Sequence, residues 1–175
     1  MPAAPNVNNY YLGKGVLKWK PVAGAFRDLG NAPQFEFVPA ISRLDHWSSR
    51  LGVRSKDFSI IHEKTATIRM ILEETGDTDN LALYLLGDVE TGVNPYDTID
   101  IFTNSDIQGS VRFIGTNDVG VKSQWDFPLV SLLPGTMLAL IGDAWGSLEL
   151  TGDVLVDPGT GKFGTVLNGI TVEVP

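Results

Sequence analysis

The sequence predicts a mainly β fold, a β-sandwich or barrel with one short flanking α-helix. Candidate strands recur about every 10–12 residues, with turn residues between them. Apolar and polar residues alternate within several of these segments, as expected where one sheet face is buried and the other meets solvent. The 175 residues include 19 glycines and 10 prolines, a composition typical of a turn-rich domain.

A single domain is expected over residues 10–175, preceded by a flexible arm at 1–9 that is rich in Pro, Asn and Ala. The first strand is expected at 10–19. A second is expected at 34–44, where apolar and polar residues alternate weakly.

A long loop is expected at about 43–57, because this segment shows no clear period. Long irregular segments inside compact domains are usually functional or disordered. The loop is basic, with Trp47 and Leu51 as apolar residues. Its candidate functional residues are Arg43, Asp45, His46, Trp47, Arg50, Leu51, Arg54 and Lys56.

Two strands are expected next, at 58–62 and 64–73. In the second, Ile68, Met70 and Leu72 share one face, which we expect to be buried.

The best helix signal covers residues 75–87. Asp77 and its neighbours supply cap candidates and an acidic first turn, and Gly87 is a plausible left-handed residue at the end. Because the helix body is apolar on nearly all sides, it should be buried against a sheet.

The second half of the chain predicts short strands separated by turns. They are expected at 98–103, 110–115, 121–127, 129–133, 137–141, 148–156 and 165–174, with a Pro134-Gly135 turn between two of them.

Charge is unevenly distributed along the chain. The net charge is −8, which makes a general affinity for nucleic acid unexpected. Residues 1–72 hold ten Lys/Arg and five Asp/Glu, whereas residues 73–175 hold three and sixteen. One interpretation is solvated loops of opposite sign. Another is a polar molecule whose basic face meets the acidic face of an identical neighbour, a contact that builds rings or filaments.

Several chemistries are disfavoured. The chain has no cysteine, which excludes disulfides, thiolate metal sites and cysteine nucleophiles. His46 with Ser48 or Ser49 supplies the residue types of a hydrolase without a nucleophile elbow, so a hydrolase is a minor hypothesis. His62 is expected to be a partly buried, hydrogen-bonded strand residue. No cofactor and no enzymatic activity are expected.

Acidic turns carry a further alternative. Carboxylates in Asp/Asn/Gly-rich turns could bind calcium, although their spacing matches no EF-hand loop. The same residues are candidates for an acidic partner surface: Asp88, Glu90, Asp97, Asp100 and Asp106.

The N-terminus lacks the basic and apolar regions of a secretory signal, and no apolar run approaches the length of a membrane span. The chain is therefore expected to stay in a cytoplasm or to be released by a route other than secretion, without a membrane partner.

Five segments, in this order, resemble the major tail tube proteins of long, non-contractile-tailed bacteriophages. They are YLGKGVLKWKPV, FRDLGNAPQFEF, SRLDHWSSRLGVRSKDF, IIHEKTATIRMILEETGDTDNLALYLLGD and SLELTGDVLVDPGTGKFG. The late hydrophobic stretch at 128–145 also suits the family.

This resemblance implies a tail-tube β-sandwich whose copies form rings, six to a ring, with inner strands joined into a continuous β-barrel. Rings would stack around a tape-measure protein, with tail terminator and tail-tip proteins at the ends, and double-stranded DNA would later pass through without specific binding. The long loop would reach an adjacent ring. Such a protein belongs to the virion and is assembled in the bacterial host cytoplasm.

The leading hypothesis from the sequence is therefore a structural virion protein that binds copies of itself. Inter-subunit ion pairs are expected from the basic loop. The acidic candidates between Asp88 and Asp106 would either be its partners or face an acidic lumen that lets DNA slide. The alternative is a calcium- or carbohydrate-binding β-sandwich module.

Overall fold

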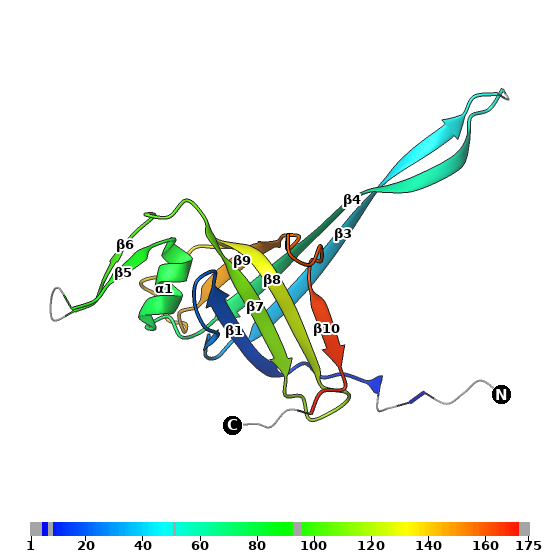
Figure 1. Ribbon diagram of the computed structural model, residues 1–175. Coiled ribbons are helices and arrows are strands. Elements are labelled where there is room, and N and C mark those ends of the chain that lie inside the picture. The colour runs from blue at the N-terminus through cyan, green and yellow to red at the C-terminus, as the bar shows by residue number, and fades with distance from the viewer. Residues whose placement is uncertain (1–4, 7–8, 51, 93–95, 172–175) are drawn as a thin grey trace.

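The computed structural model describes residues 5–6, 9–50, 52–92 and 96–171. It is mainly β, with antiparallel strands and one short helix among the described residues, which confirms the fold class expected from the sequence (Figure 1). The strands are β1 Gly15–Pro21, β2 Arg27–Asp28, β3 Gln34–Ser48, β4 Ser55–Leu72, β5 Asp88–Glu90, β6 Thr98–Asp100, β7 Ile107–Gly115, β8 Ser123–Pro134, β9 Leu148–Val154 and β10 Thr165–Asn168; the helix is α1 Thr78–Leu85.

The larger sheet has the strand order β2-β1-β7-β8-β9-β4-β3, with β10 also pairing with β8. This sheet folds over itself. Phe35 of β3 stacks on Phe113 of β7 with ring centroids 5.7 Å apart, and Phe37 stacks on Phe127 of β8 at 5.3 Å. Strands distant in the sheet order therefore lie face to face, and the core lies between them.

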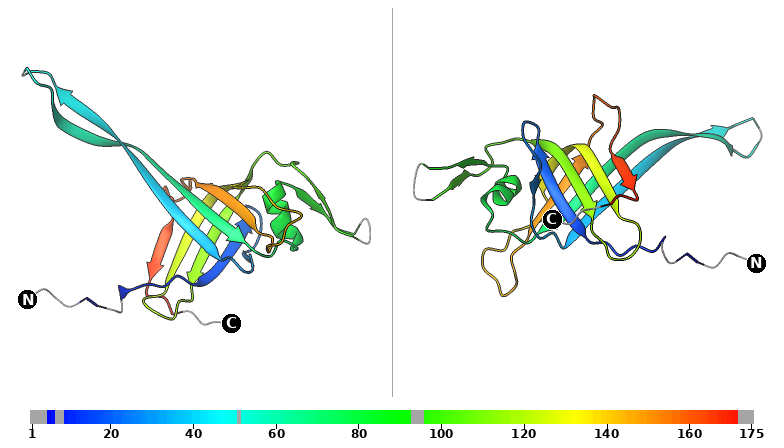
Figure 2. Two further views of the ribbon diagram at one scale, coloured as in Figure 1. Left: turned by 180° about the vertical axis from the view of Figure 1, so that it is seen from behind. Right: turned by 60° about the horizontal axis from the view of Figure 1, so that its bottom comes forward.

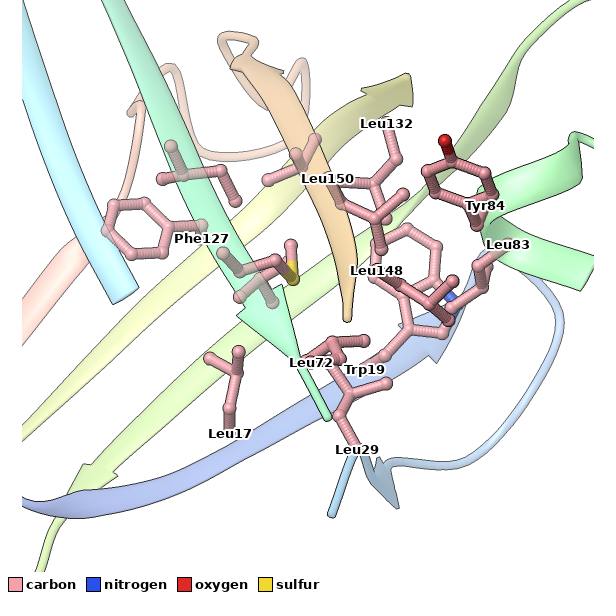
Figure 3. Close-up of a cluster of buried hydrophobic side chains, with 14 of the residues drawn as sticks. Leu17, Trp19, Leu29, Leu72, Leu83, Tyr84, Phe127, Leu132, Leu148 and Leu150 are labelled. Atoms are coloured by element: carbon pink, nitrogen blue, oxygen red, sulfur yellow. The ribbon is translucent and has the colours of Figure 1, made fainter. Parts of the chain in front are cut away.

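The core follows the alternation along the strands. Trp19, Met70 and Leu148 come from three different strands and are buried. Figure 3 shows this cluster with Leu83 and Tyr84 of α1, which closes one end of the core. Burying each such side chain contributes about 1.5–3 kcal/mol.

The helix begins as the sequence predicts. The Asp77 side chain accepts a hydrogen bond from the Asn80 backbone N–H at 2.8 Å. The expected left-handed residue was misplaced: Leu86, with φ of 48°, adopts that conformation. Gly87 has another role, because a Cβ there would lie 2.5 Å from the Asp100 carbonyl oxygen.

The prediction of a long loop at about 43–57 is wrong. β3 continues to Ser48 and β4 starts at Ser55, so the segment is the end of a long β-hairpin. The pairing register shifts between Ser42 and Arg43 and again between His46 and Trp47. Each shift resets the alternation of side chains, which is why the sequence shows no period there.

Two pairs of expected strands are each one strand. The segments 58–62 and 64–73 form β4, and 121–127 and 129–133 form β8. The sequence predicts a strand break at Pro128, but β8 continues through it. The residues of β8 that pair with β7 change from Val130 to Phe127, so Pro128 has no partner on β7. Its missing N–H therefore removes no ladder bond on that side.

Other expectations need correction. Residues 137–141 form no strand, and Pro134 ends β8 rather than starting a turn between strands. Of the expected arm at 1–9, residues 1–4, 7 and 8 lie outside the described residues. The expected last strand at 165–174 is described only as far as residue 171 and is a strand at 165–168.

Within the described part of the chain, no helix has the length and apolar content needed to cross a membrane.

Candidate functional site

The β3–β4 hairpin extends far beyond the core. We call residues 38–65 the arm. β9 pairs with β4 only from Ala66 onward, so no other described strand pairs with the arm. Figure 1 shows it projecting from the body, and no described residue of it is buried. An isolated two-stranded hairpin is marginally stable in water, so this arm favours a partner surface.

One face of the arm carries a group of apolar side chains around Leu44. Leu44 pairs with Ile60, and His46 pairs with Phe58, two residues further along each strand. These pairs lie on the same face because side chains of a strand repeat every second residue. The Phe58 side chain is 62% exposed, and Leu44 and Ile60 are also exposed. A contiguous apolar surface of this kind is characteristic of an interaction site.

The opposite face carries a small polar network. Lys56 Nζ lies 2.7 Å from Asp45 Oδ1, and the Ser59 hydroxyl donates to the same oxygen at 2.7 Å. The hydrogen bond from Lys56, followed by that from Ser59, holds the pKa of Asp45 below its usual value. Asp45 and Lys56 therefore stabilise the arm itself, and Lys56 is already paired.

The remaining cations of the basic segment face solvent. Arg43, Arg50 and Arg54 are exposed and form no ion pair with any described residue. Trp47 is also exposed, whereas Leu51 lies outside the described residues. Three of the four cations expected to pair between subunits thus form no ion pair in the described chain, and of these Arg43 contributes to the lowered pKa of Asp45.

His46 has a carboxylate partner that the sequence reasoning missed. Its Nδ1 lies 2.6 Å from Asp57 Oδ1. The register shift beside His46 brings Asp57 close, and no sequence pattern signals it. Among the described residues no hydroxyl is hydrogen-bonded to His46, and Ser48 pairs with Ser55. The arrangement therefore lacks the nucleophile contact that a hydrolase needs.

The expectation for His62 is wrong. It is exposed and occupies the extra position of the register shift, between Glu63, which pairs with Ser42, and Ile61, which pairs with Arg43.

A second projection is acidic. β5 and β6 pair into a short hairpin, and we call residues 88–100 the acidic hairpin. Asp88 lies directly opposite Asp100, and Glu90 opposite Thr98; Asp97 precedes β6. All four carboxylates are exposed. Like charges placed opposite each other cost stability, so a cationic partner would relieve their repulsion.

The acidic hairpin is fixed to the helix end. The Phe102 N–H donates to the Leu85 carbonyl at 3.0 Å, and the Asn104 N–H donates to the Leu86 carbonyl at 2.9 Å. Figures 1 and 2 show this hairpin and the arm pointing away from opposite sides of the body. The molecule thus has a basic end and an acidic end.

The fifth acidic candidate lies elsewhere. Asp106 precedes β7 and accepts hydrogen bonds from Gln108 at 2.6 Å and Ser131 at 2.5 Å. Over the ranges that the structure describes, no three His, Asp or Glu side chains gather in a way that could hold a metal ion.

Comparison with known proteins gives two matches. Residues 10–94 match a family described as a protein of unknown function. The chain is also 26% identical over 157 residues to an acetylglutamate kinase of Saccharophagus degradans, a match that covers 83% of this chain and 51% of that protein. The chain thus spans about half the length of the curated relative it matches, and at this identity the match carries no activity over to it.

Proposed function

We propose that this chain is a structural subunit that binds copies of itself in stacked rings, forming the hollow tail tube of a long, non-contractile-tailed phage. The observation that carries the proposal is the arm. It holds an apolar face and three unpaired arginines beyond the core, on the side opposite the acidic hairpin.

The arm supports self-assembly through its exposed apolar side chains. Leu44, Phe58 and Ile60 have no apolar partner layer across them in the described chain, because the arm stands clear of the body. Covering such a face removes apolar area from water at about 25 cal/mol per Å². We take a neighbouring copy of the chain as the partner that covers this face, because the acidic hairpin at the other end of each copy suits the basic arm.

Charge gives the contact a direction. The basic segment and the acidic hairpin differ in sign and lie at opposite ends. A copy joined basic end to acidic end leaves one end of each sign free, so growth continues or closes into a ring. Complementary charges also accelerate the encounter and disfavour the reversed orientation.

The overall charge suits a conduit for DNA. Duplex DNA carries one phosphate charge about every 1.7 Å of its axis. A subunit with net charge −8 does not hold that polymer by electrostatic attraction. In this proposal the tape-measure, tail terminator and tail-tip proteins are the other partners, double-stranded DNA passes through the lumen, and assembly occurs in the host cytoplasm before incorporation into the virion.

Negative-stain electron microscopy of the purified protein tests the proposal, with Arg50→Glu combined with Arg54→Glu as the key variant. Wild-type protein is expected to form rings or hollow tubes. The variant is expected to remain folded without growing tubes, because the reversed charges repel the acidic end. Truncating one partner of a buried interfacial charge pair costs about 2–5 kcal/mol, because the other charge is left unpaired.

Lys20→Glu combined with Lys162→Glu is the matched control, since it changes net charge equally at positions outside the arm, and Lys20 lies opposite Ser110 rather than a carboxylate. Its tubes should resemble wild type. Normal tubes from the arm variant would remove the basic segment from the assembly contact, and a monomer under every condition would contradict the function.

The calcium- or carbohydrate-binding module makes an opposite prediction. Binding to the folded state raises stability by mass action, so a calcium-binding module melts at a higher temperature with calcium than with a chelator. A tube subunit should show no such difference. A calcium-dependent rise in a persistently monomeric protein would favour the module.

A further inference from the structure

The apolar side chains of the arm share one face because β4 contains an extra residue. Leu44 lies an odd number of residues from Phe37 along β3, so these two side chains point to opposite faces. Ile60 lies an even number of residues from Ile68, the cross-strand partner of Phe37, and would share its face in a regular strand. The unpaired position at His62 shifts this alternation, and Ile60 pairs with Leu44 instead. Extra residues that redirect side chains in this way are over-represented beside functional sites.

The shifted pairing gathers three exposed apolar side chains, which we call the arm cluster: Leu44, Phe58 and Ile60. Charged residues lie beyond both ends of this cluster. Toward the body, Glu63 pairs with Ser42 on the same face of the arm. Toward the tip, Asp57 is bonded to His46, and Arg50 and Arg54 lie between β3 and β4. The cluster therefore has a carboxylate on its body side and two arginines without an ion-pair partner in the described chain on its tip side.

A second exposed apolar group follows the acidic hairpin. Ile101 and Phe102 form the turn after β6, and Phe102 is 67% exposed. The Phe102 backbone is left-handed, with φ of 57°. This conformation is costly for a bulky residue and persists only where the surrounding structure enforces it, often at binding sites. The hydrogen bond from the Phe102 N–H to the Leu85 carbonyl at the end of α1 supplies that support. A strained backbone thus holds an aromatic residue at the surface, which favours a binding role.

The turn at Ile101 has an acidic border. Asp100 directly precedes it, and Asp88 lies opposite Asp100 across the acidic hairpin. The four carboxylates of this hairpin form no ion pair with any described residue. Arg27, the cation that contacts the helix, lies at the other end of α1, with its Nη1 3.7 Å from Asp77 Oδ1. The exposed aromatic residue is therefore bordered by negative charge that the described chain leaves without an ion-pair partner.

These two groups cannot meet within one molecule. The arm projects from one side of the body, and the acidic hairpin projects from the opposite side (Figures 1 and 2). The arm cluster calls for an apolar partner with negative charge on the side of the arm's tip. The turn at Ile101 and Phe102 provides both properties. Because each chain carries one group at either end, the partner that fits is a second copy.

We propose that Phe102 of one copy docks against the arm cluster of the next copy, with the tip of the arm beside the acidic hairpin and Glu63 directed away from it. This inference rests on the proposed function and deepens it by naming the side chain that covers the arm. The contact uses different surfaces on the two copies, so it can repeat from copy to copy. An aromatic anchor at the centre with charged residues at the border is the arrangement typical of stable interfaces.

Phe102→Gly separates binding from folding. Glycine adopts a positive φ without steric cost, so the melting temperature should stay the same or rise. Self-association measured by sedimentation should weaken at least tenfold, because the aromatic anchor is lost. Val22→Gly, at an exposed position outside both surfaces, is the control and should leave association unchanged. A residue with a purely structural role would give the opposite results, a lower melting temperature with unchanged association, and these would overturn the inference.

Cross-linking shows which face of the arm is covered, because the chain has no cysteine of its own. Leu44→Cys protein is mixed with Ile101→Cys protein and a short bis-maleimide, and a mass tag on one of them identifies the mixed dimer. Ile41→Cys is the matched control, since Ile41 is exposed and lies on the opposite face of the arm. The mixed dimer should be at least tenfold more abundant with Leu44→Cys than with Ile41→Cys. Equal yields would overturn the inference.

Charge reversal tests the orientation of the arm. Asp97→Lys combined with Asp100→Lys, added to the Arg50→Glu and Arg54→Glu variant, restores the net charge and puts opposite charges together again. Self-association should recover at least tenfold relative to the arm variant. Asp143→Lys combined with Asp153→Lys is the matched control, because both residues are exposed, form no ion pair in the described chain and lie outside the acidic hairpin. Equal recovery from this control would overturn the orientation.

Electron micrographs of the same variants separate this contact from the tube proposal. Specific cross-links through Leu44→Cys without rings or tubes would support the contact and contradict the tube. Tubes that grow normally from Phe102→Gly protein would support the tube and contradict the contact. A wild-type protein that stays monomeric at every concentration would contradict both.

Discussion

The Arg69 side chain links its own strand, β4, to β3 and β9 through two ion pairs. Its Nε lies 2.5 Å from Glu149 Oε1 on β9, and its Nη1 lies 3.6 Å from Glu36 Oε2 on β3. Glu149 also accepts a hydrogen bond from Thr136 at 2.9 Å, and its side chain is only 14% exposed. The hydrogen bond from Arg69, then that from Thr136, keeps the pKa of Glu149 below its usual value of 4.5.

Glu149→Gln is expected to lower the melting temperature at pH 7 by about 2–4 °C. A carboxyl whose pKa is lower in the folded state stabilises the fold above its unfolded-state pKa. That stabilisation is lost as the pH falls through the lowered folded-state pKa. The difference between wild type and variant should therefore be largest near neutrality and vanish in acid.

Thermal melts from pH 7 to pH 3 provide the measurement. Glu63→Gln is the control, because Glu63 is exposed and forms no ion pair with the described residues. A deficit that persists unchanged in acid would mean that Glu149 acts through packing rather than through its charge.

The arm is the element at which the structure differs most from the sequence-based prediction. Alternation predicted the buried face of β4 well, because Ile68, Met70 and Leu72 repeat every second residue and all three are buried. The arm has no buried face to impose a pattern, and its register shifts interrupt what alternation remains. The basic residues of the candidate surface could be named, but the hairpin that carries them could not be predicted, because its register shifts leave no clear period in the sequence.

Shortening the arm should separate folding from assembly. Replacing residues 43–62 by Asn-Gly joins Ser42 to Glu63, a cross-strand pair, through a turn that suits hairpins. Because no described arm residue is buried, the melting temperature should stay within about 4 °C of wild type. Tubes should disappear from micrographs.

A variant with an arm of normal length shows whether assembly depends on the length of the arm or on its apolar face. Leu44→Ser, Phe58→Ser and Ile60→Ser together keep the arm's length and remove its apolar face. Loss of tubes in this variant would assign assembly to the apolar face. Normal tubes here, with none from the short arm, would assign it to length.

The whole molecule is electrically polar, with the arm and the acidic hairpin on opposite sides. Attraction between exposed charges extends about 10 Å at 0.1 M salt and about 3 Å at 1 M. We expect the initial rate of assembly, followed by light scattering, to fall at least tenfold between these NaCl concentrations. Faster assembly at 1 M NaCl would instead show that apolar contacts govern the rate.

The pairing of β4 also determines how a force applied to the tip of the arm is transmitted to the body. β4 continues from the arm into the sheet, where residues from Ala66 to Leu72 pair with β9 from Val154 to Leu148. The ladder bonds of antiparallel strands run perpendicular to the strands, so tension along the arm shears all of these pairs at once instead of opening them one by one. Arg69 and Glu149 tie the same two strands together. In an assembly joined through its arms, stretching or bending would thus be resisted by the paired strands of each subunit's larger sheet.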